Sequence, residues 1–291
     1  MRISLEDGVT ESGVTRFLKI GEGEIAYDVI GEGPLVVLVP GMGDSRRAYR
    51  FLAPVLAAAG YRVAAVDLRG HGESSLGWDS NTRTDTANDI VALIEHLGGP
   101  AVVVGHSFAG GAATIAAARR PELVGALVEI GPFTRPQQPD LGGLLRDSAY
   151  RRGMTLLMGV AIFRSTGMWK SYLAHAYPGV RPADWADYLT ALGDDLAGPG
   201  RMAVLSAMGT AAPKDAGAHL GGIRCAALVV MGSRDPDWAD PRAEADGIVA
   251  GMPAGLGRVA MIDGAGHYPH AQYPGEVAAA VLAFLKEEAR A

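Results

Sequence analysis

Short runs of apolar residues alternate along the chain with segments in which apolar residues recur every third or fourth position. The runs are typical of strands buried in a parallel sheet, and the segments between them are typical of amphipathic helices. The runs are LVVLV from Leu35, RVAAV from Arg62, AVVV from Ala101 and LVGALVEI from Leu123, with helices expected near 45–59, 86–97 and 108–119. This order predicts an α/β fold with a mostly parallel, doubly wound sheet.

The pattern also predicts how the sheet begins and ends. TRFLKI and EIAYDVI, separated by GEGE, predict an antiparallel hairpin at one edge of the sheet. After residue 221 the alternation returns with CAALVVMG, a helix over 241–250, GRVAMIDGAG and a last helix, EVAAAVLAFLKEEA.

Between these two parts, residues 134–221 carry helical periodicity without any strand-like run. We therefore predict an inserted helical lid over 134–221, with 1–133 and 222–291 forming the two parts of one core domain. The insertion is rich in methionine and aromatic residues, which adapt well to apolar ligands. From this group we expect three residues to contact an apolar substrate: Met158, Phe163 and Trp169.

The stretch AVVVGHSFAGG, over 101–111, places Ser107 at a corner between a strand and a helix. Gly105, Ser107 and Ala109 form G-x-S-x-A, a variant of the G-x-S-x-G nucleophile elbow. Small flanking residues let the helix pass close to the strands at such a strained turn. The helix N-terminus also brings backbone N–H groups beside Ser107, where they could stabilise a negative oxygen. The pattern predicts a nucleophilic serine.

A serine of this kind needs an acid and a base after it in the chain, each at the carboxyl end of a strand. Of the four histidines after Ser107, His267 is the one that closely follows a predicted core strand. Asp235 lies in the loop after AALVVMG and is the acid that we favour. Two alternatives remain open: Asp237, two residues further on, and Glu129, in the strand after the elbow helix.

Composition and charge exclude several other kinds of protein. With 291 residues, 48% hydrophobic and 20% charged, the chain is long enough to fold around a large core. A net charge of −6 without a long basic run argues against a nucleic-acid or anionic-membrane partner. The opening MRISLEDGVTES has no apolar signal region, and no uncharged apolar stretch reaches about 18 residues, so we expect a cytoplasmic protein. The single cysteine, Cys225, argues against an internal disulfide.

Cofactor and metal motifs also fail at particular positions. In VLVPGMGDS, Arg46 stands where a dinucleotide fingerprint needs its third glycine, and Asp44 stands where a P-loop needs lysine. The chain lacks H-E-x-x-H, and His267 and His270 have no further ligands at a recognisable spacing. We expect neither a cofactor nor a metal ion.

Five segments, taken in order, resemble the α/β-hydrolase superfamily in its lidded branch of esterases and lactonases. They are VPGMGDS, VDLRGHGES, VGHSFAGG, MGSRDP and DGAGHYPH. The resemblance covers roughly residues 35–133 and 225–285. A serine at the elbow differs from the aspartate that haloalkane dehalogenases and epoxide hydrolases of this superfamily use there.

The resemblance implies a role for each matching residue. Ser107 would be the nucleophile, His267 the general base and then acid, and Asp235 the group that orients the imidazole. The oxyanion hole would be the backbone N–H groups of Met42 and Phe108.

These roles imply a serine hydrolase that cleaves a carboxylic ester or lactone of a small, apolar molecule. The same triad could instead act on a thioester, an amide or a C–C bond, or catalyse perhydrolysis. The alternative of another class is a ligand receptor or carrier that keeps the fold without turnover. No pattern in the sequence indicates an oligomeric state.

Overall fold

The computed structural model describes residues 14–136, 140–211 and 213–288. The opening dozen residues, in which we expect no secretory signal, lie outside these ranges. Within them, no helix combines the length and the apolar character that a membrane-spanning helix needs.

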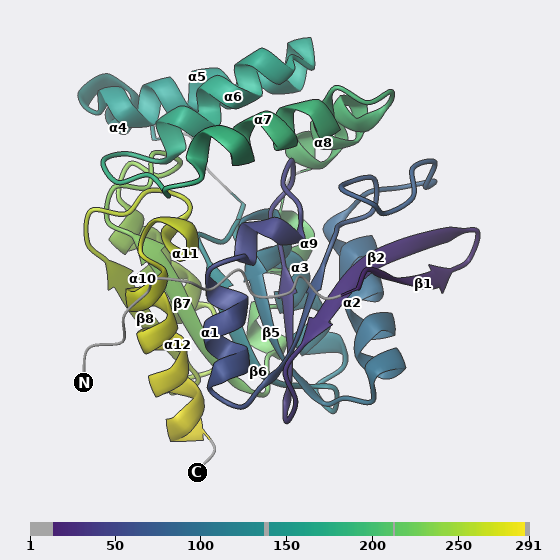
Figure 1. Cartoon of the computed structure of the whole chain (residues 1–291). Coiled ribbons are helices and arrows are strands. Elements are labelled where there is room, and N and C mark those ends of the chain that lie inside the picture. The colour runs from purple at the N-terminus through teal and green to yellow at the C-terminus, as the bar shows by residue number, and fades with distance from the viewer. Residues whose placement is uncertain (1–13, 137–139, 212, 289–291) are drawn as a thin grey trace.

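An eight-stranded sheet lies at the centre of the molecule, in the order β1-β2-β4-β3-β5-β6-β7-β8 (Figure 1). The pairs from β4 to β8 are parallel, whereas β1 with β2 and β2 with β4 are antiparallel. The strands are β1 (Arg16–Ile20), β2 (Gly23–Ile30), β3 (Leu35–Val39), β4 (Arg62–Val66), β5 (Ala101–His106), β6 (Val124–Ile130), β7 (Ala226–Gly232) and β8 (Gly257–Ile262). The predicted fold, a mostly parallel sheet with an antiparallel hairpin at one edge, is confirmed.

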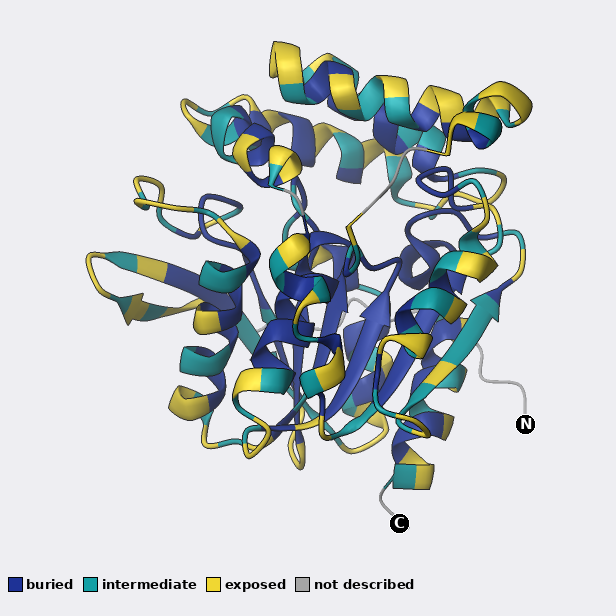
Figure 2. Ribbon diagram, turned by 180° about the vertical axis from the view of Figure 1, so that it is seen from behind, coloured by how far each residue is buried: buried dark blue, intermediate teal, exposed yellow. Residues whose placement is uncertain are grey.

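Helices cover both faces of the sheet, and alternate residues of each strand feed two separate cores. In β3, Val37 packs in the core on one face and Val36 in the core on the other. The first core includes α2 (Arg83–Leu97), α3 (Phe108–Arg119) and α10 (Pro241–Ala250); the second includes η1 (Arg46–Tyr49), α1 (Leu52–Ala58) and α12 (Pro274–Glu288). The short α11 (Pro269–Gln272) precedes α12. Figure 2 shows the strands buried between the two layers.

Two helix boundaries differ from the sequence prediction. The helix expected over 45–59 is divided into η1 and α1, and Pro54 lies in the first turn of α1, where its missing N–H is tolerated. The helix expected from 86 begins at Arg83. There, Thr82 and Asp85 form a capping box in which each side chain accepts a hydrogen bond from the other's backbone N–H.

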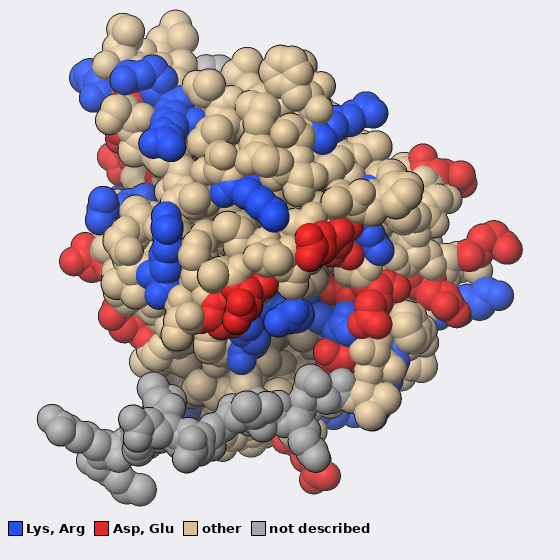
Figure 3. All heavy atoms as spheres, turned by 45° about the horizontal axis from the view of Figure 1, so that its top comes forward, with Lys and Arg blue, Asp and Glu red and all other residues tan. Residues whose placement is uncertain are grey.

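The segment between β6 and β7 is helical wherever it has regular structure. It contains α4 (Leu141–Arg146), α5 (Ser148–Phe163), α6 (Thr166–Ala176), α7 (Trp185–Leu196), α8 (Arg201–Thr210), α9 (Lys214–Gly217) and η2 (Leu220–Gly222). Helices α4 to α8 form a layer beyond one end of the sheet (Figure 1). Trp169 and Tyr172 belong to the apolar core of this layer, which also includes Tyr268 from the core domain. Figure 3 shows acidic and basic side chains interspersed over the molecular face that includes this layer.

The turn from β5 into α3 brings the backbone very close to itself. A Cβ atom added at Gly105 would lie 2.4 Å from the carbonyl oxygen of Ala109, so only glycine fits at that position. Gly125, in the neighbouring strand β6, has no such restriction, because its added Cβ would lie no closer than 3.9 Å to the backbone oxygen of Ala101.

We expect Gly105→Ala to lower the melting temperature by about 3 to 10 °C, because the overpacked turn must move to admit a methyl group. Gly125→Ala is the matched control and should change the melting temperature much less. Thermal unfolding followed by circular dichroism measures both. Equal shifts in the two variants would contradict the close approach at Gly105.

Candidate active site

Ser107 lies directly after β5 and before α3, with its backbone at φ 53° and ψ −118°. This positive-φ conformation is rare for a residue with a side chain and persists only where the surroundings hold it. Here the Ser107 N–H donates to the oxygen of Ile130 (2.9 Å), and its carbonyl accepts from the N–H of Phe133 (3.1 Å). The hydroxyl borders a cavity of about 420 Å³ beneath the helical layer.

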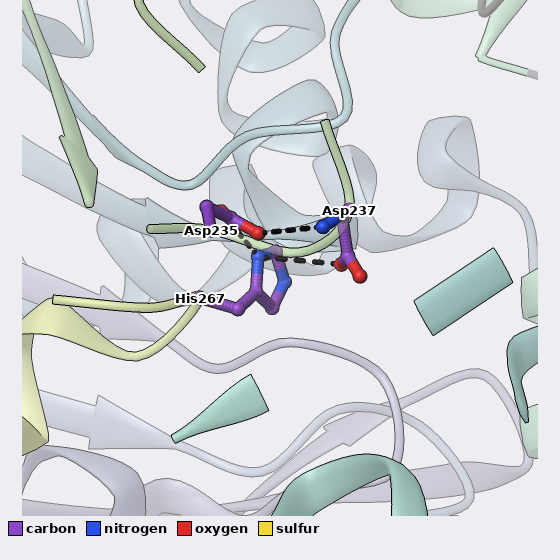
Figure 4. A group of neighbouring side chains, drawn as sticks. All are labelled: Asp235, Asp237 and His267. Carbon is purple, nitrogen blue, oxygen red and sulfur yellow. Dashed lines mark hydrogen bonds and ion pairs between the residues drawn. The ribbon is translucent and has the colours of Figure 1, made fainter. Parts of the chain in front are cut away.

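His267 and Asp235 meet because β7 and β8 are neighbouring parallel strands, and each residue lies in the loop that follows its strand. Both side chains are almost completely buried. His267 Nδ1 lies 2.8 Å from Asp235 Oδ2 (Figure 4). This contact favours the tautomer with the proton on Nδ1, which leaves Nε2 free to accept a proton.

His267 also borders the cavity that Ser107 borders. Among the described residues, Ser107 Oγ and His267 Nε2 form no hydrogen bond. Such bonds are often long in a protein without substrate and shorten in the complex. The backbone of His267 is held on both sides. Its N–H donates to the carbonyl oxygen of Ala176 (3.0 Å), and its carbonyl oxygen lies 2.9 Å from His106 Nε2.

Asp237 provides a second buried carboxyl group beside the imidazole. Its Oδ2 lies 3.4 Å from His267 Nδ1 and accepts a hydrogen bond from the Tyr172 hydroxyl (2.7 Å). Its N–H donates to Asp235 Oδ1 (3.0 Å), and Figure 4 shows the three side chains together. Burial raises the pKa of Asp237 to about 6, with the charge of nearby Asp235 adding to the effect.

These two carboxyl groups decide the protonation of the base. Burial on its own lowers the pKa of His267, but the charges of Asp235 and Asp237 outweigh it and raise the pKa from 6.5 to about 9. The imidazolium is therefore stabilised near neutral pH, and the neutral imidazole that can accept a proton becomes more abundant as the pH rises.

Glu129, the other alternative for the acid, points elsewhere. Its side chain accepts hydrogen bonds from Thr114 and Thr134, and burial raises its pKa to about 7. It has no contact with His267 within the described part of the chain. The geometry thus favours Asp235, with Asp237 second.

The loop after β3 places Met42 at the same cavity, opposite the start of α3 at Phe108. His71 Nε2 accepts from the N–H of Gly43 (2.9 Å), and Trp169 Nε1 donates to the oxygen of Gly43 (3.1 Å), so both neighbours fix this loop. Over the described ranges, neither the Met42 nor the Phe108 N–H has an intramolecular acceptor. Both N–H groups therefore remain without a partner in the described structure.

The three residues expected to contact substrate are placed differently. Met158 and Trp169 line the cavity. Phe163 does not, and this expectation was wrong: it is the last residue of α5, and its side chain is 71% exposed. Helical periodicity predicted the helix but not which face of it turns toward the core.

Sequence reasoning missed two polar residues at the cavity, Tyr172 and Arg83. Tyr172 is one of the aromatic residues of the insertion, and no pattern in the sequence indicated that its hydroxyl contacts Asp237. Arg83 gave no signal, because an arginine near the start of a helix is usually solvated.

The three side chains of Figure 4 could in principle also hold a metal ion, since each has one ligand atom within 4.8 Å of the others. Their ligand atoms, however, already contact one another, and Tyr172 donates to Asp237. We interpret the group as a hydrogen-bonded network.

Comparison with known proteins shows the family to which the chain belongs. The sequence model of the alpha/beta hydrolase family matches residues 36–280, and the chain belongs to this family. It is 33% identical over 115 residues to bifunctional epoxide hydrolase 2 of Mus musculus, a match that covers 38% of the chain and 21% of that protein. It is 31% identical over 182 residues to 2-(acetamidomethylene)succinate hydrolase of Mesorhizobium japonicum, covering 61% of each.

Solved structures share the fold over nearly the whole chain. A putative lipase from Acinetobacter baumannii has a TM-score of 0.77 at 19% identity, covering 95% of this chain and 92% of its own. The enol-lactonase from Burkholderia xenovorans has a TM-score of 0.74 at 18% identity, covering 93% and 100%. The resemblance predicted from the sequence is thus confirmed at the level of family and fold.

We expect the two carboxyl groups to be separable by their effect on His267. In NMR titrations, the His267 pKa should lie above 6.5 in the unmodified protein, fall in Asp237→Asn, and fall further in Asp235→Asn, whose carboxylate is closer. Removing a negative neighbour destabilises the imidazolium, which sets the sign.

The His267 signal is the one missing from a His267→Gln spectrum. Asp246→Asn, on the exposed surface of α10, removes the same charge at a distance from the site and should leave the titration unchanged. An unshifted pKa in both site variants would contradict the geometry of Figure 4.

Proposed function

We propose that this chain is a serine hydrolase that cleaves a carboxylic ester or lactone of a small molecule. The observation that carries the proposal is the buried His267–Asp235 pair, whose histidine borders the same cavity as a serine held in a strained turn. A serine hydroxyl needs an adjacent base to act as a nucleophile, and an oriented imidazole in its neutral form provides one.

In the proposed reaction, Ser107 Oγ attacks the substrate carbonyl while His267 Nε2 accepts its proton. The tetrahedral oxyanion accepts hydrogen bonds from the N–H groups of Met42 and Phe108. The imidazolium then protonates the leaving alkoxide, which departs and leaves an acyl group on Ser107. Water, deprotonated by His267, attacks the acyl carbonyl; the imidazolium then returns the proton to Ser107 Oγ as the carboxylic acid product leaves. Asp235 holds the imidazole and stabilises its cation in both halves.

The family relationship supports hydrolysis as the reaction. The residue at the elbow narrows the kinds of bond that the protein could cleave. Several relatives are named epoxide hydrolases. Attack of a carboxylate on an epoxide gives an ester that water can cleave, whereas attack of a serine would give a stable ether and stop after one event. Ser107 therefore supports acyl chemistry for this chain.

The helical insertion supports a substrate with an apolar part. Its side chains Met154, Leu157, Met158, Trp169, Leu205 and Met208 line the cavity. We propose that the insertion acts as a lid whose inner face binds the acyl chain. A cytoplasmic location, and the absence of nucleic-acid and membrane partners, stay predictions.

The proposal predicts covalent labelling by a fluorophosphonate, whose adduct places an oxygen at the oxyanion donors. Intact-mass analysis should find one adduct, mapped to Ser107, and none in Ser107→Ala or His267→Ala. The unlabelled protein should turn over simple esters or lactones and should not turn over an aryl epoxide measured beside them.

Labelling with only a single slow turnover would favour the receptor or carrier. Turnover of the epoxide in Ser107→Ala would move the nucleophile elsewhere. A folded protein, checked by circular dichroism, that neither labels nor turns over esters would refute the proposal.

The lid role predicts a difference between two residues of one helix. Met158→Ala should change the preference among ethyl esters from acetate to octanoate, because a cavity wall contacts the remote part of the acyl chain. Phe163→Ala, also on α5 but outside the cavity lining, is the matched control and should leave the ratio of kcat/KM values unchanged. Equal changes in both variants would contradict the assigned wall.

A further inference from the structure

An arginine borders the cavity of Ser107 without taking part in the proposed chemistry. Arg83 is the first residue of α2, and its side chain is only 4% exposed. A Cβ added at Gly111 would lie 2.9 Å from Arg83 Cδ, so α3 leaves room for this stem. The guanidinium carbon lies 4.4 Å from the centre of the Phe108 ring, beside the nucleophile.

The guanidinium is incompletely paired. Nη1 donates to the oxygen of Ala211 (2.7 Å), whereas Nε is buried and has no partner among the described residues. Nη2 forms no hydrogen bond there either, and no described carboxylate lies within ion-pairing distance of Arg83. Burial lowers its pKa to about 10, and the more distant charge of Asp215 offsets this only in part.

A buried charge without a counter-ion in the protein is unfavourable unless a ligand of opposite charge pairs with it. Nε and Nη2 lie on the same edge of a guanidinium, and this edge is the one that binds a carboxylate through two parallel hydrogen bonds. Lys214, exposed at the cavity rim, adds a second positive charge. Among the described residues of the lining, Asp237 has a carboxyl group, and this group already accepts a hydrogen bond from Tyr172.

We infer that Arg83 binds a carboxylate of the substrate, so that the substrate is an ester or lactone that also carries a free carboxylate remote from the reacting carbonyl. The inference rests on the proposed function and narrows it to anionic substrates. The apolar wall contacts the intervening carbon chain, and the Nε and Nη2 edge of Arg83 binds its charged end.

The test compares monoethyl succinate, glutarate and adipate with uncharged ethyl alkanoates of matched length. We expect a higher kcat/KM for the acid at one chain length, which reports the span from Ser107 to Arg83. Arg83→Gln should lower the acid-to-neutral ratio about 10- to 100-fold, and Arg83→Lys should restore part of it. Arg242→Gln, on the exposed surface of α10, removes the same charge and should leave the ratio unchanged.

A purely structural role for Arg83, holding Ala211, would lower both rates together and leave the ratio unchanged, which would overturn the inference. A second measurement does not depend on turnover. By calorimetry, glutarate or adipate should bind to the Ser107→Ala variant, and this binding should be lost in the double variant that also carries Arg83→Gln. If the diacid binds only when Arg83 is present, but the unmodified protein turns over no ester, the result would support the inference and refute the proposed function. Ester turnover without acid preference or diacid binding would do the reverse.

Discussion

The site depends on one backbone constraint, the reversal of the chain at Ser107 between β5 and α3. At φ 53° the serine is strained, and it is held because its N–H and carbonyl are both bonded to the next segment of the core. Two glycines allow the close approach: an added Cβ at Gly105 would meet Ala109, and one at Gly41 would lie 3.0 Å from Ser107 Cβ. A residue larger than glycine would displace either the hydroxyl or the loop that carries Met42.

Hydrogen bonds between buried polar groups join the helical insertion to the core domain. Tyr172 of α6 donates to Asp237 in the loop after β7, and Tyr188 of α7 donates to Asp44 in the loop after β3. Burial raises the pKa of both carboxyl groups to about 6. Each tyrosine hydroxyl therefore donates to a buried group that would destabilise the fold if it had no hydrogen-bond partner. The insertion therefore positions the loops on both sides of Ser107 as well as covering the cavity.

Local pattern predicts elements, and topology predicts which loops meet. The runs of β3 to β8 were predictable from their apolar character, and Ser107, Asp235 and His267 could be brought together because the carboxyl ends of parallel strands share one edge. The orientation of a helix about its own axis was not predictable. Phe163 was therefore misplaced, and Arg83 was missed because its burial depends on Gly111 of α3, far away in sequence.

The features that local pattern and topology predict are those that the family shares. The features that they do not predict are those that set the choice of substrate. Structures under 25% identical superimpose over more than nine-tenths of the chain, so the fold persists while most side chains change. In the proposed reaction, the strained serine and the oriented histidine act on a carbonyl whatever is attached to it. Selectivity must then come from cavity groups outside the five sequence segments that identify the family. We propose Arg83 and Met158 as such groups, because both line the cavity and the contrast between a buried cation and an apolar wall would distinguish one acyl chain from another.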